Sequence, residues 1–161
     1  MMAPKINSMR VLEQHDIPYE ALPYDASIKD AEEVAEVIGA PAFMVYKTLI
    51  VMPAGEKKPL VIMIASDREL DLKAVAAATG FKKVQMAKHS EAERLTGLQV
   101  GGISALALMN KNWPIYLDQA ASELQHICIS AGQRGLQLRV PVMPLLGLLK
   151  ARIIDASRDK A

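Results

Sequence analysis

The sequence has few residues of the kinds that crosslink chains or bind metals. Its 161 residues include one cysteine, Cys128, which excludes an internal disulfide and indicates a reducing compartment. The three histidines, His15, His89 and His126, stand far apart in the chain. Because no zinc-ligand spacing is present, we expect no metal and no cofactor.

Long apolar runs and a strong net charge are also missing. No stretch reaches the ~18 apolar residues of a membrane-spanning helix, and the N-terminal residues lack the apolar core of a signal peptide. We therefore expect a cytoplasmic protein that does not enter a membrane. Lys and Arg total 19 against 18 Asp and Glu, so the charge does not indicate nucleic-acid binding as that of a strongly basic protein would. The length and composition predict one globular domain over residues 1–161.

Three common catalytic motifs are absent. The sequence has no GxxxxGK[ST] phosphate loop, no GxSxG elbow and no GxGxxG turn after a strand. The sequence therefore does not support assignment to the nucleotide hydrolases, the α/β-hydrolases or the dinucleotide-binding enzymes. Cys128 lies in an apolar strand pattern, where a buried inert thiol is more common than a nucleophile. The residues thus offer no evident protein nucleophile.

An apolar run at residues 43–51 is the most informative stretch that is present. It is rich in β-branched residues and is followed, after a polar interval with Pro and Gly, by a second run at residues 60–65. This pattern predicts a β-hairpin. Side chains alternate along a strand, so Tyr46 and Thr48 share one face while Lys47 takes the other. Such a lysine either extends from a sheet edge or points into a cleft that needs a cation.

The rest of the chain mixes short helices and strands without regular alternation. This predicts an α+β fold on a mixed or curled sheet. Residues 157–161 are expected to fray. Capping residues and apolar spacing predict helices at about 6–15, 27–39, 71–80, 90–96 and 145–149, and strands at about 19–24, 81–86, 114–118, 126–130 and 136–140.

Two glycine-containing bends could carry chemistry. One is Gly101-Gly102-Ile103-Ser104 and the other is Gly132-Gln133-Arg134-Gly135. Backbone N–H groups at such a bend can stabilise an oxyanion, and a nearby cation can hold a phosphate or carboxylate. A β-bulge or an ordinary turn explains the paired glycines equally well.

Several short motifs, separated along the sequence, resemble those of one known family. They are Val45-Tyr46-Lys47-Thr48-Leu49, Asp71-Leu72-Lys73, Lys83-Val84-Gln85-Met86-Ala87, Thr96-Gly97, Val100-Gly101-Gly102-Ile103-Ser104 and Ser130-Ala131-Gly132-Gln133-Arg134-Gly135-Leu136. In order and spacing they are similar to the YbaK family of aminoacyl-tRNA deacylases, relatives of the prolyl-tRNA synthetase editing domain. The resemblance implies one α+β domain with a mixed, barrel-like β-sheet flanked by short helices. It also implies trans-editing, in which the ester between a wrong amino acid and its tRNA is hydrolysed.

The resemblance also implies the residues of the site. Lys47 matches the essential lysine, expected at the phosphate or ribose of the terminal adenosine, and Thr48 lines the same pocket. Gly101, Gly102, Ile103 and Ser104 match the loop whose backbone amides face the scissile carbonyl. We assign substrate binding to a further set: Tyr24, Tyr46, Ser130, Gly132, Arg134 and Gln137.

The partners implied are aminoacyl-tRNA, in particular tRNA(Pro), and prolyl-tRNA synthetase. In cysteine-specific members the substrate's own thiol is thought to attack the ester, whereas in alanine-specific relatives a bound water does so. Neither route requires a nucleophile from the protein, in agreement with the absence of one in this sequence.

This chain departs from the cysteine-specific pattern at two positions. Gln137 stands where those members have an aspartate, and Ala105 follows Ser104 where a proline is common. Gln137 cannot act as an anionic base or hold an amino group by charge. Discrimination by side-chain size and recognition of the amino group are therefore both open. The substrate that the resemblance implies is Cys-tRNA(Pro) or another small amino acid on tRNA(Pro). The alternative is a non-catalytic module that retains the pocket and binds aminoacyl-tRNA or a synthetase.

Overall fold

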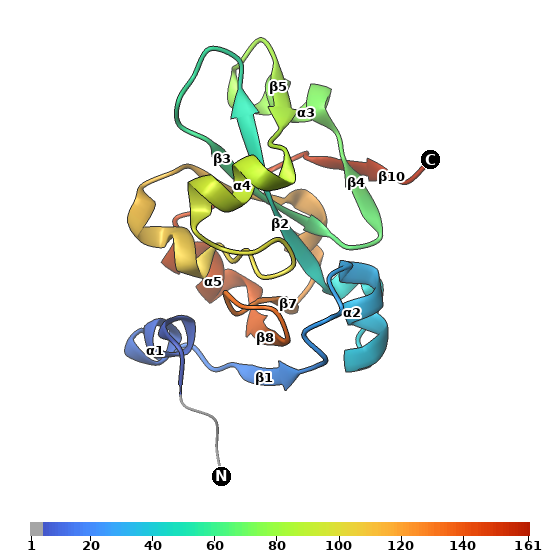
Figure 1. Cartoon of the computed structure of the whole chain (residues 1–161), viewed down its shortest axis with the longest axis vertical. Helices are drawn as coiled ribbons and strands as arrows, with labels where there is room; N and C mark the ends of the chain where they lie inside the picture. The colour runs from blue at the N-terminus through green and yellow to red at the C-terminus, as the bar shows by residue number, and fades with distance from the viewer. Residues whose placement is uncertain (1–4) are drawn as a thin grey trace.

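The computed structural model describes residues 5–161, and a five-stranded mixed sheet lies at its centre (Figure 1). The strand order is β5-β2-β3-β6-β9. β2 pairs antiparallel with β3 and β5, whereas β3–β6 and β6–β9 are parallel pairs. The strands are β2 (Tyr46–Pro53), β3 (Leu60–Ala65), β5 (Val84–Met86), β6 (Ile115–Asp118) and β9 (Arg152–Ile154). The predicted α+β class with a mixed sheet is confirmed.

The predicted hairpin forms the middle of this sheet. Tyr46 pairs with Ala65 at one end and Val51 pairs with Leu60 at the other. All six residues of β3 are buried, because apolar clusters cover both faces of the sheet. A continuous apolar run is what such a two-sided burial requires.

A second, three-stranded sheet has the order β1-β8-β7. It consists of β1 (Glu20–Pro23), β7 (His126–Ser130) and β8 (Leu136–Pro141), all paired antiparallel. β1 is an edge strand, as expected for a segment that contains proline. An isolated bridge between Val45 and Cys128 links this sheet to the start of β2.

Short helices connect the strands, close to where the sequence predicts them. Asp30 caps α2 and Asp71 caps α3, each side chain accepting a hydrogen bond from a backbone N–H three residues later. Gly39 and Gly80 end these helices in the left-handed conformation. The helices are α1 (Asn7–Gln14), α2 (Ala31–Ile38), α3 (Leu72–Thr79), α4 (His89–Thr96) and α5 (Val142–Leu149), with 3-10 turns η1 (Ala42–Met44), η2 (Leu106–Lys111) and η3 (Gln119–Glu123). Across residues 5–161, no helix has the length and apolar character needed to cross a membrane.

One expectation about the fold is not confirmed and another is wrong. The sheets do not close into a barrel within the described chain, so the barrel-like shape is not confirmed. The C-terminal segment does not fray, because Ser157–Asp159 forms β10, paired antiparallel with β4 (Arg68–Leu70). Asp118, a buried residue at the end of β6, anchors β10 by accepting hydrogen bonds from Ala156 N–H at 2.8 Å and Ser157 Oγ–H at 2.6 Å.

Candidate active site

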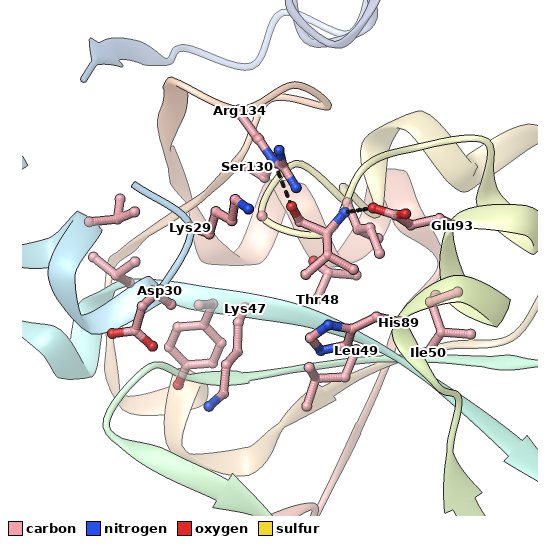
Figure 2. Close-up of a pocket in the computed structure, with 18 of the residues that line it drawn as sticks. Lys29, Asp30, Lys47, Thr48, Leu49, Ile50, His89, Glu93, Ser130 and Arg134 are labelled. Atoms are coloured by element: carbon pink, nitrogen blue, oxygen red, sulfur yellow. Dashed lines mark hydrogen bonds between the residues drawn. The ribbon is translucent and has the colours of Figure 1, made fainter. Parts of the chain in front are cut away.

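A cavity of about 640 Å³ lies along the first half of β2. β5 pairs with residues 51–53 of β2, and Ala87 N–H donates to Ile50 O, so the strand edge that faces the cavity lies before Ile50. The remaining walls come from the start of α2, from α4, from the loop after α4, and from the β7–β8 hairpin. Figure 2 shows Arg134, Ser130 and Glu93 on one side of β2, and Asp30 and the amine of Lys47 toward the other. The volume is typical of a small-molecule or nucleotide site.

Lys47 is a half-buried cation in this cavity. Within residues 5–161, no carboxylate lies within 4.0 Å of its Nζ. Burial lowers the pKa of Lys47, and the nearby charge of Lys160 lowers it further. Figure 2 shows the side chain directed away from Arg134. The nearby charges of Asp30, Glu32 and Asp67 act on this pKa in the opposite direction, but none forms an ion pair with the amine. The cation is thus partly desolvated, and an anionic ligand would stabilise it.

Three residues that line this cavity each have a buried polar side-chain atom without a hydrogen-bond partner in the described chain. These atoms are Thr48 Oγ1, Gln137 Oε1 and Tyr46 Oη. Thr48 is 9% exposed, Gln137 5% and Tyr46 2%. A buried polar atom without a partner is destabilising. These three are side chains of the cavity wall whose hydrogen bonding is incomplete within the described chain.

Ser130 and Gln137 reach the cavity together because they are paired across β7 and β8. Paired residues project their side chains from the same face of a sheet. The Ser130 hydroxyl accepts a hydrogen bond from Gly132 N–H at 3.2 Å, so its own proton can still be donated to a ligand.

The glycine loop reaches the cavity through only some of its residues. Gly101 and Ile103 line the cavity, whereas Gly102 and Ser104 do not. Gly102 N–H donates to Gln99 O at 2.8 Å. Ser104 is fully buried, and its Oγ accepts a hydrogen bond from Leu106 N–H.

Two other predicted residues also lie outside this cavity. Tyr24 sits beside the β7–β8 turn, where its N–H donates to Gly135 O at 2.9 Å. Its hydroxyl is buried and has no partner among residues 5–161. Gly132 lines a separate groove beside α1. The structure thus brings together eight of the twelve predicted residues: Tyr46, Lys47, Thr48, Gly101, Ile103, Ser130, Arg134 and Gln137.

Four ionisable residues at the cavity were not predicted: Lys29, Asp30, His89 and Glu93. Asp30 was recognisable only as part of a helix start, and His89 had no neighbouring motif. Glu93 accepts a hydrogen bond from Val100 N–H at 2.8 Å, while Arg134 Nε donates one to Val100 O at 2.7 Å. The Arg134 contact links segments 34 residues apart, and the Glu93 contact joins a helix to the loop that follows it, so no strand or helix periodicity could have revealed them.

Cys128 is set apart from this chemistry. It is 1% exposed, and burial raises the pKa of its thiol to about 11. The protonated, inaccessible thiol is not a nucleophile at neutral pH, which agrees with the sequence prediction.

No group of three His, Cys, Asp or Glu side chains in the described part of the chain is arranged to hold a metal. The cavity offers the cations Lys29, Lys47 and Arg134, the carboxylates Asp30 and Glu93, His89, neutral hydrogen-bonding groups and the backbone of the glycine loop. Cations and backbone N–H groups are suited to binding an activated ester and stabilising its oxyanion.

Comparison with protein families gives one match that covers most of the chain. Residues 25–147 match the model of the aminoacyl-tRNA editing domain. A protein of Enterococcus faecalis, EbsC, is 36% identical over 153 residues, which cover 94% of this chain and 92% of that protein. Its name proposes Cys-tRNA(Pro)/Cys-tRNA(Cys) deacylase activity. A proline–tRNA ligase of Sulfurihydrogenibium is 30% identical over 82% of this chain, a match that spans 22% of the ligase.

Solved structures share the same fold. The hypothetical protein APE2540 has a TM-score of 0.84 at 21% identity, over 93% of this chain and 98% of that one. A protein described as a candidate trans-editing enzyme for prolyl-tRNA synthetase has a TM-score of 0.79 at 23% identity, over 96% of this chain and 99% of that one.

Proposed function

Because the chain belongs to the aminoacyl-tRNA editing domain family and is therefore an aminoacyl-tRNA deacylase, we propose that it edits in trans and removes cysteine from tRNA(Pro). Alanine and other small amino acids on tRNA(Pro) are the next candidates. The relative named for Cys-tRNA(Pro) and Cys-tRNA(Cys) matches over nearly its whole length, which supports this choice. The activity belongs in the cytoplasm, where prolyl-tRNA synthetase would supply the mischarged tRNA.

One observation carries the proposal: Lys47, Thr48 and Gln137 line a single cavity. Among the described residues, Lys47 Nζ has no ion-pair partner, and Thr48 Oγ1 and Gln137 Oε1 have no hydrogen-bond partner. In our assignment, Lys47 engages the phosphate or ribose of the terminal adenosine as a point charge. Thr48 and Gln137 supply hydrogen bonds to the aminoacyl group. Apolar residues Ala31, Val34 and Val45 line the same cavity and would favour a small side chain.

The reaction needs little more than alignment, since an aminoacyl ester is already activated. A nucleophile attacks the carbonyl carbon, and the carbonyl electrons move to the oxygen as an oxyanion. When the oxyanion collapses, the bond to the ribose oxygen breaks and that oxygen takes a proton. With water as nucleophile, the products are the free amino acid and tRNA. With the thiol of a cysteinyl substrate, a cyclic thioester forms first and water then opens it to the same products.

Deacylation of a defined tRNA panel tests this function. The panel is Cys-, Ala-, Ser- and Pro-tRNA(Pro), together with Cys-tRNA(Cys) and Ala-tRNA(Ala). We expect turnover of Cys-tRNA(Pro) that Lys47→Ala abolishes without lowering the melting temperature. Lys73→Ala is the matched control, because Lys73 is an exposed lysine on α3 that does not line the cavity.

Two further results would revise the proposal. Turnover of 2-aminobutyryl-tRNA(Pro), which lacks the thiol, at the rate of the cysteinyl substrate would exclude attack by the substrate thiol. If no member of the panel turned over while tRNA still bound, the chain would instead be a binding module.

A further inference from the structure

The loop between α4 and η2 is held at Val100 from two sides. Val100 N–H donates to Glu93 Oε2 at 2.8 Å, and Arg134 Nε donates to Val100 O at 2.7 Å. Glu93 comes from α4 and Arg134 from the β7–β8 turn. Figure 2 shows the two side chains approaching the same short piece of main chain, each joined to it by a dashed line. Two separate elements therefore fix the course of this loop.

The hydrogen bond from Arg134 also fixes the next backbone amide. No cis peptide bond occurs in residues 5–161, so the N–H of Gly101 points opposite to the C=O of Val100. With that carbonyl held toward Arg134, the Gly101 N–H is directed to the other side of the peptide. Gly101 N–H meets no acceptor in the described chain, whereas Gly102 N–H is used by Gln99 O. Since Gly101 also lines the cavity, its N–H is the amide of this pair that a substrate can use.

The loop and the β7–β8 turn are packed closely against each other at Gly102. A Cβ added to Gly102 would lie 2.8 Å from Arg134 N and 2.9 Å from Gln133 C, which leaves no room for a side chain. Gly101 has φ +91°, a conformation that favours glycine. The two glycines and Arg134 therefore form one interlocked unit at the cavity wall.

From this geometry we infer that Arg134 and Glu93 are positioning residues for hydrolysis, aiming the Gly101 N–H at the carbonyl oxygen of the ester. The inference rests on the proposed deacylase function. The guanidinium beside Val100 O polarises the Val100–Gly101 peptide and makes its N–H a better donor. When the nucleophile attacks, the oxyanion accepts this hydrogen bond and no proton is transferred to the loop. The interaction strengthens as negative charge develops, so it acts on kcat more than on KM.

Single-turnover and steady-state kinetics on the best substrate of the panel test the inference. Arg134→Ala should lower kcat about 100-fold with little change in KM. Added guanidinium ion should restore part of that loss by occupying the vacated position. Glu93→Ala should lower kcat less. Glu93→Gln, which keeps an acceptor for Val100 N–H, should recover most of the difference. Glu91→Ala on α4 and Arg139→Ala on β8 are matched controls, because neither residue lines the cavity.

A non-hydrolysable analogue with an amide in place of the ester separates positioning from binding. Its Kd should be the same for the wild-type protein and Arg134→Ala. A raised KM and Kd with unchanged kcat would overturn the inference, because Arg134 would then hold the substrate directly. Wild-type kinetics in Arg134→Ala would also overturn it while leaving the deacylase function intact. Failure of the wild-type protein itself on every substrate would instead count against the proposed function.

Discussion

Two groups of buried polar side chains in this protein differ in how well they are satisfied. At the end of β6, Asp118 is 2% exposed, and each of its carboxylate oxygens accepts a hydrogen bond. Arg68 continues this network by donating to Ser157 Oγ at 2.6 Å. Along β2, in contrast, Thr48 Oγ1 and the nearby Gln137 Oε1 have no partner within residues 5–161.

The contrast separates a structural site from a ligand site. A fully paired polar network rigidifies the fold, and here it holds the C-terminal strand. Unpaired buried atoms destabilise the protein until something binds them. We therefore expect substitutions in the Asp118 network to act on stability, and substitutions at Thr48 and Gln137 to act on deacylation.

The largest effect on stability is expected for Asp118→Ala. Removing the carboxylate leaves Ala156 N–H and Ser157 Oγ–H without their acceptor in a buried position, at about 3 kcal/mol. For a chain of this length that corresponds to a fall in melting temperature of about 6–12 °C. Thermal unfolding followed by circular dichroism measures it, with the exposed Asp155→Ala as control. An unchanged melting temperature would mean that β10 is not held by this network.

In contrast to Asp118→Ala, the substitutions Thr48→Val and Gln137→Met should not lower the stability of the protein. Each replaces an unpaired buried polar group by an apolar group of similar size, which should leave the free energy of unfolding unchanged or raise it by about 1 kcal/mol. Deacylation should fall at least tenfold, since one hydrogen bond to the substrate is lost. Denaturant unfolding and panel kinetics on the same preparations measure both quantities. A loss of stability together with retained activity would reverse the assignment of these residues.

A smaller effect should appear in the pH dependence at Lys47. Burial lowers the pKa of the folded-state amine below its value in the unfolded chain. Between these two pKa values the unfolded state binds more protons, so the free energy of unfolding should rise with pH there. Lys47→Met should remove this slope. The change is expected to stay below about 1 kcal/mol, because the side chain is only half-buried.

Deacylation activity should fall with rising pH over the same pH range in which the free energy of unfolding rises. If the cation engages the substrate, kcat/KM falls as pH rises through the lowered pKa of Lys47. Lys47→Arg, which stays charged, should carry any remaining activity to higher pH. Rates must be corrected for spontaneous ester hydrolysis at each pH. An alkaline limb that is identical in the wild-type protein and Lys47→Arg would assign the titration to another group.

The sequence predicted the parts of the fold that local patterns encode. The β2–β3 hairpin follows from two apolar runs, and α2 and α3 follow from their aspartate caps and terminal glycines. β10 could not be found in this way. Its three residues, Ser157–Asp159, carry no apolar alternation and depend on Arg68 and Asp118 from distant strands. The barrel-like shape implied by the resemblance also depends on long-range pairing, and it is not confirmed.

The candidate site follows the same division. Lys47 and Thr48 were visible as polar residues within an apolar strand, and the glycine loop was visible as a bend. The roles within the loop were not visible, because only the three-dimensional structure shows that Gly102 N–H is occupied while Gly101 N–H is not. Glu93 and Lys29 reach the cavity from separate elements that no sequence spacing connects.

The smallest effect is expected for Cys128, a buried group that belongs neither to the paired Asp118 network nor to the unpaired residues along β2. It is buried in the cluster behind Val45, and a thiol is so weak a donor that it behaves as a small apolar group. Its thiol, with a pKa raised to about 11, should not react with a disulfide reagent at pH 8 until the protein is unfolded. Cys128→Ala should keep wild-type kcat/KM on every substrate of the panel. Rapid labelling of the native protein, or loss of deacylation in Cys128→Ala, would show that this side chain takes part in the site despite its burial.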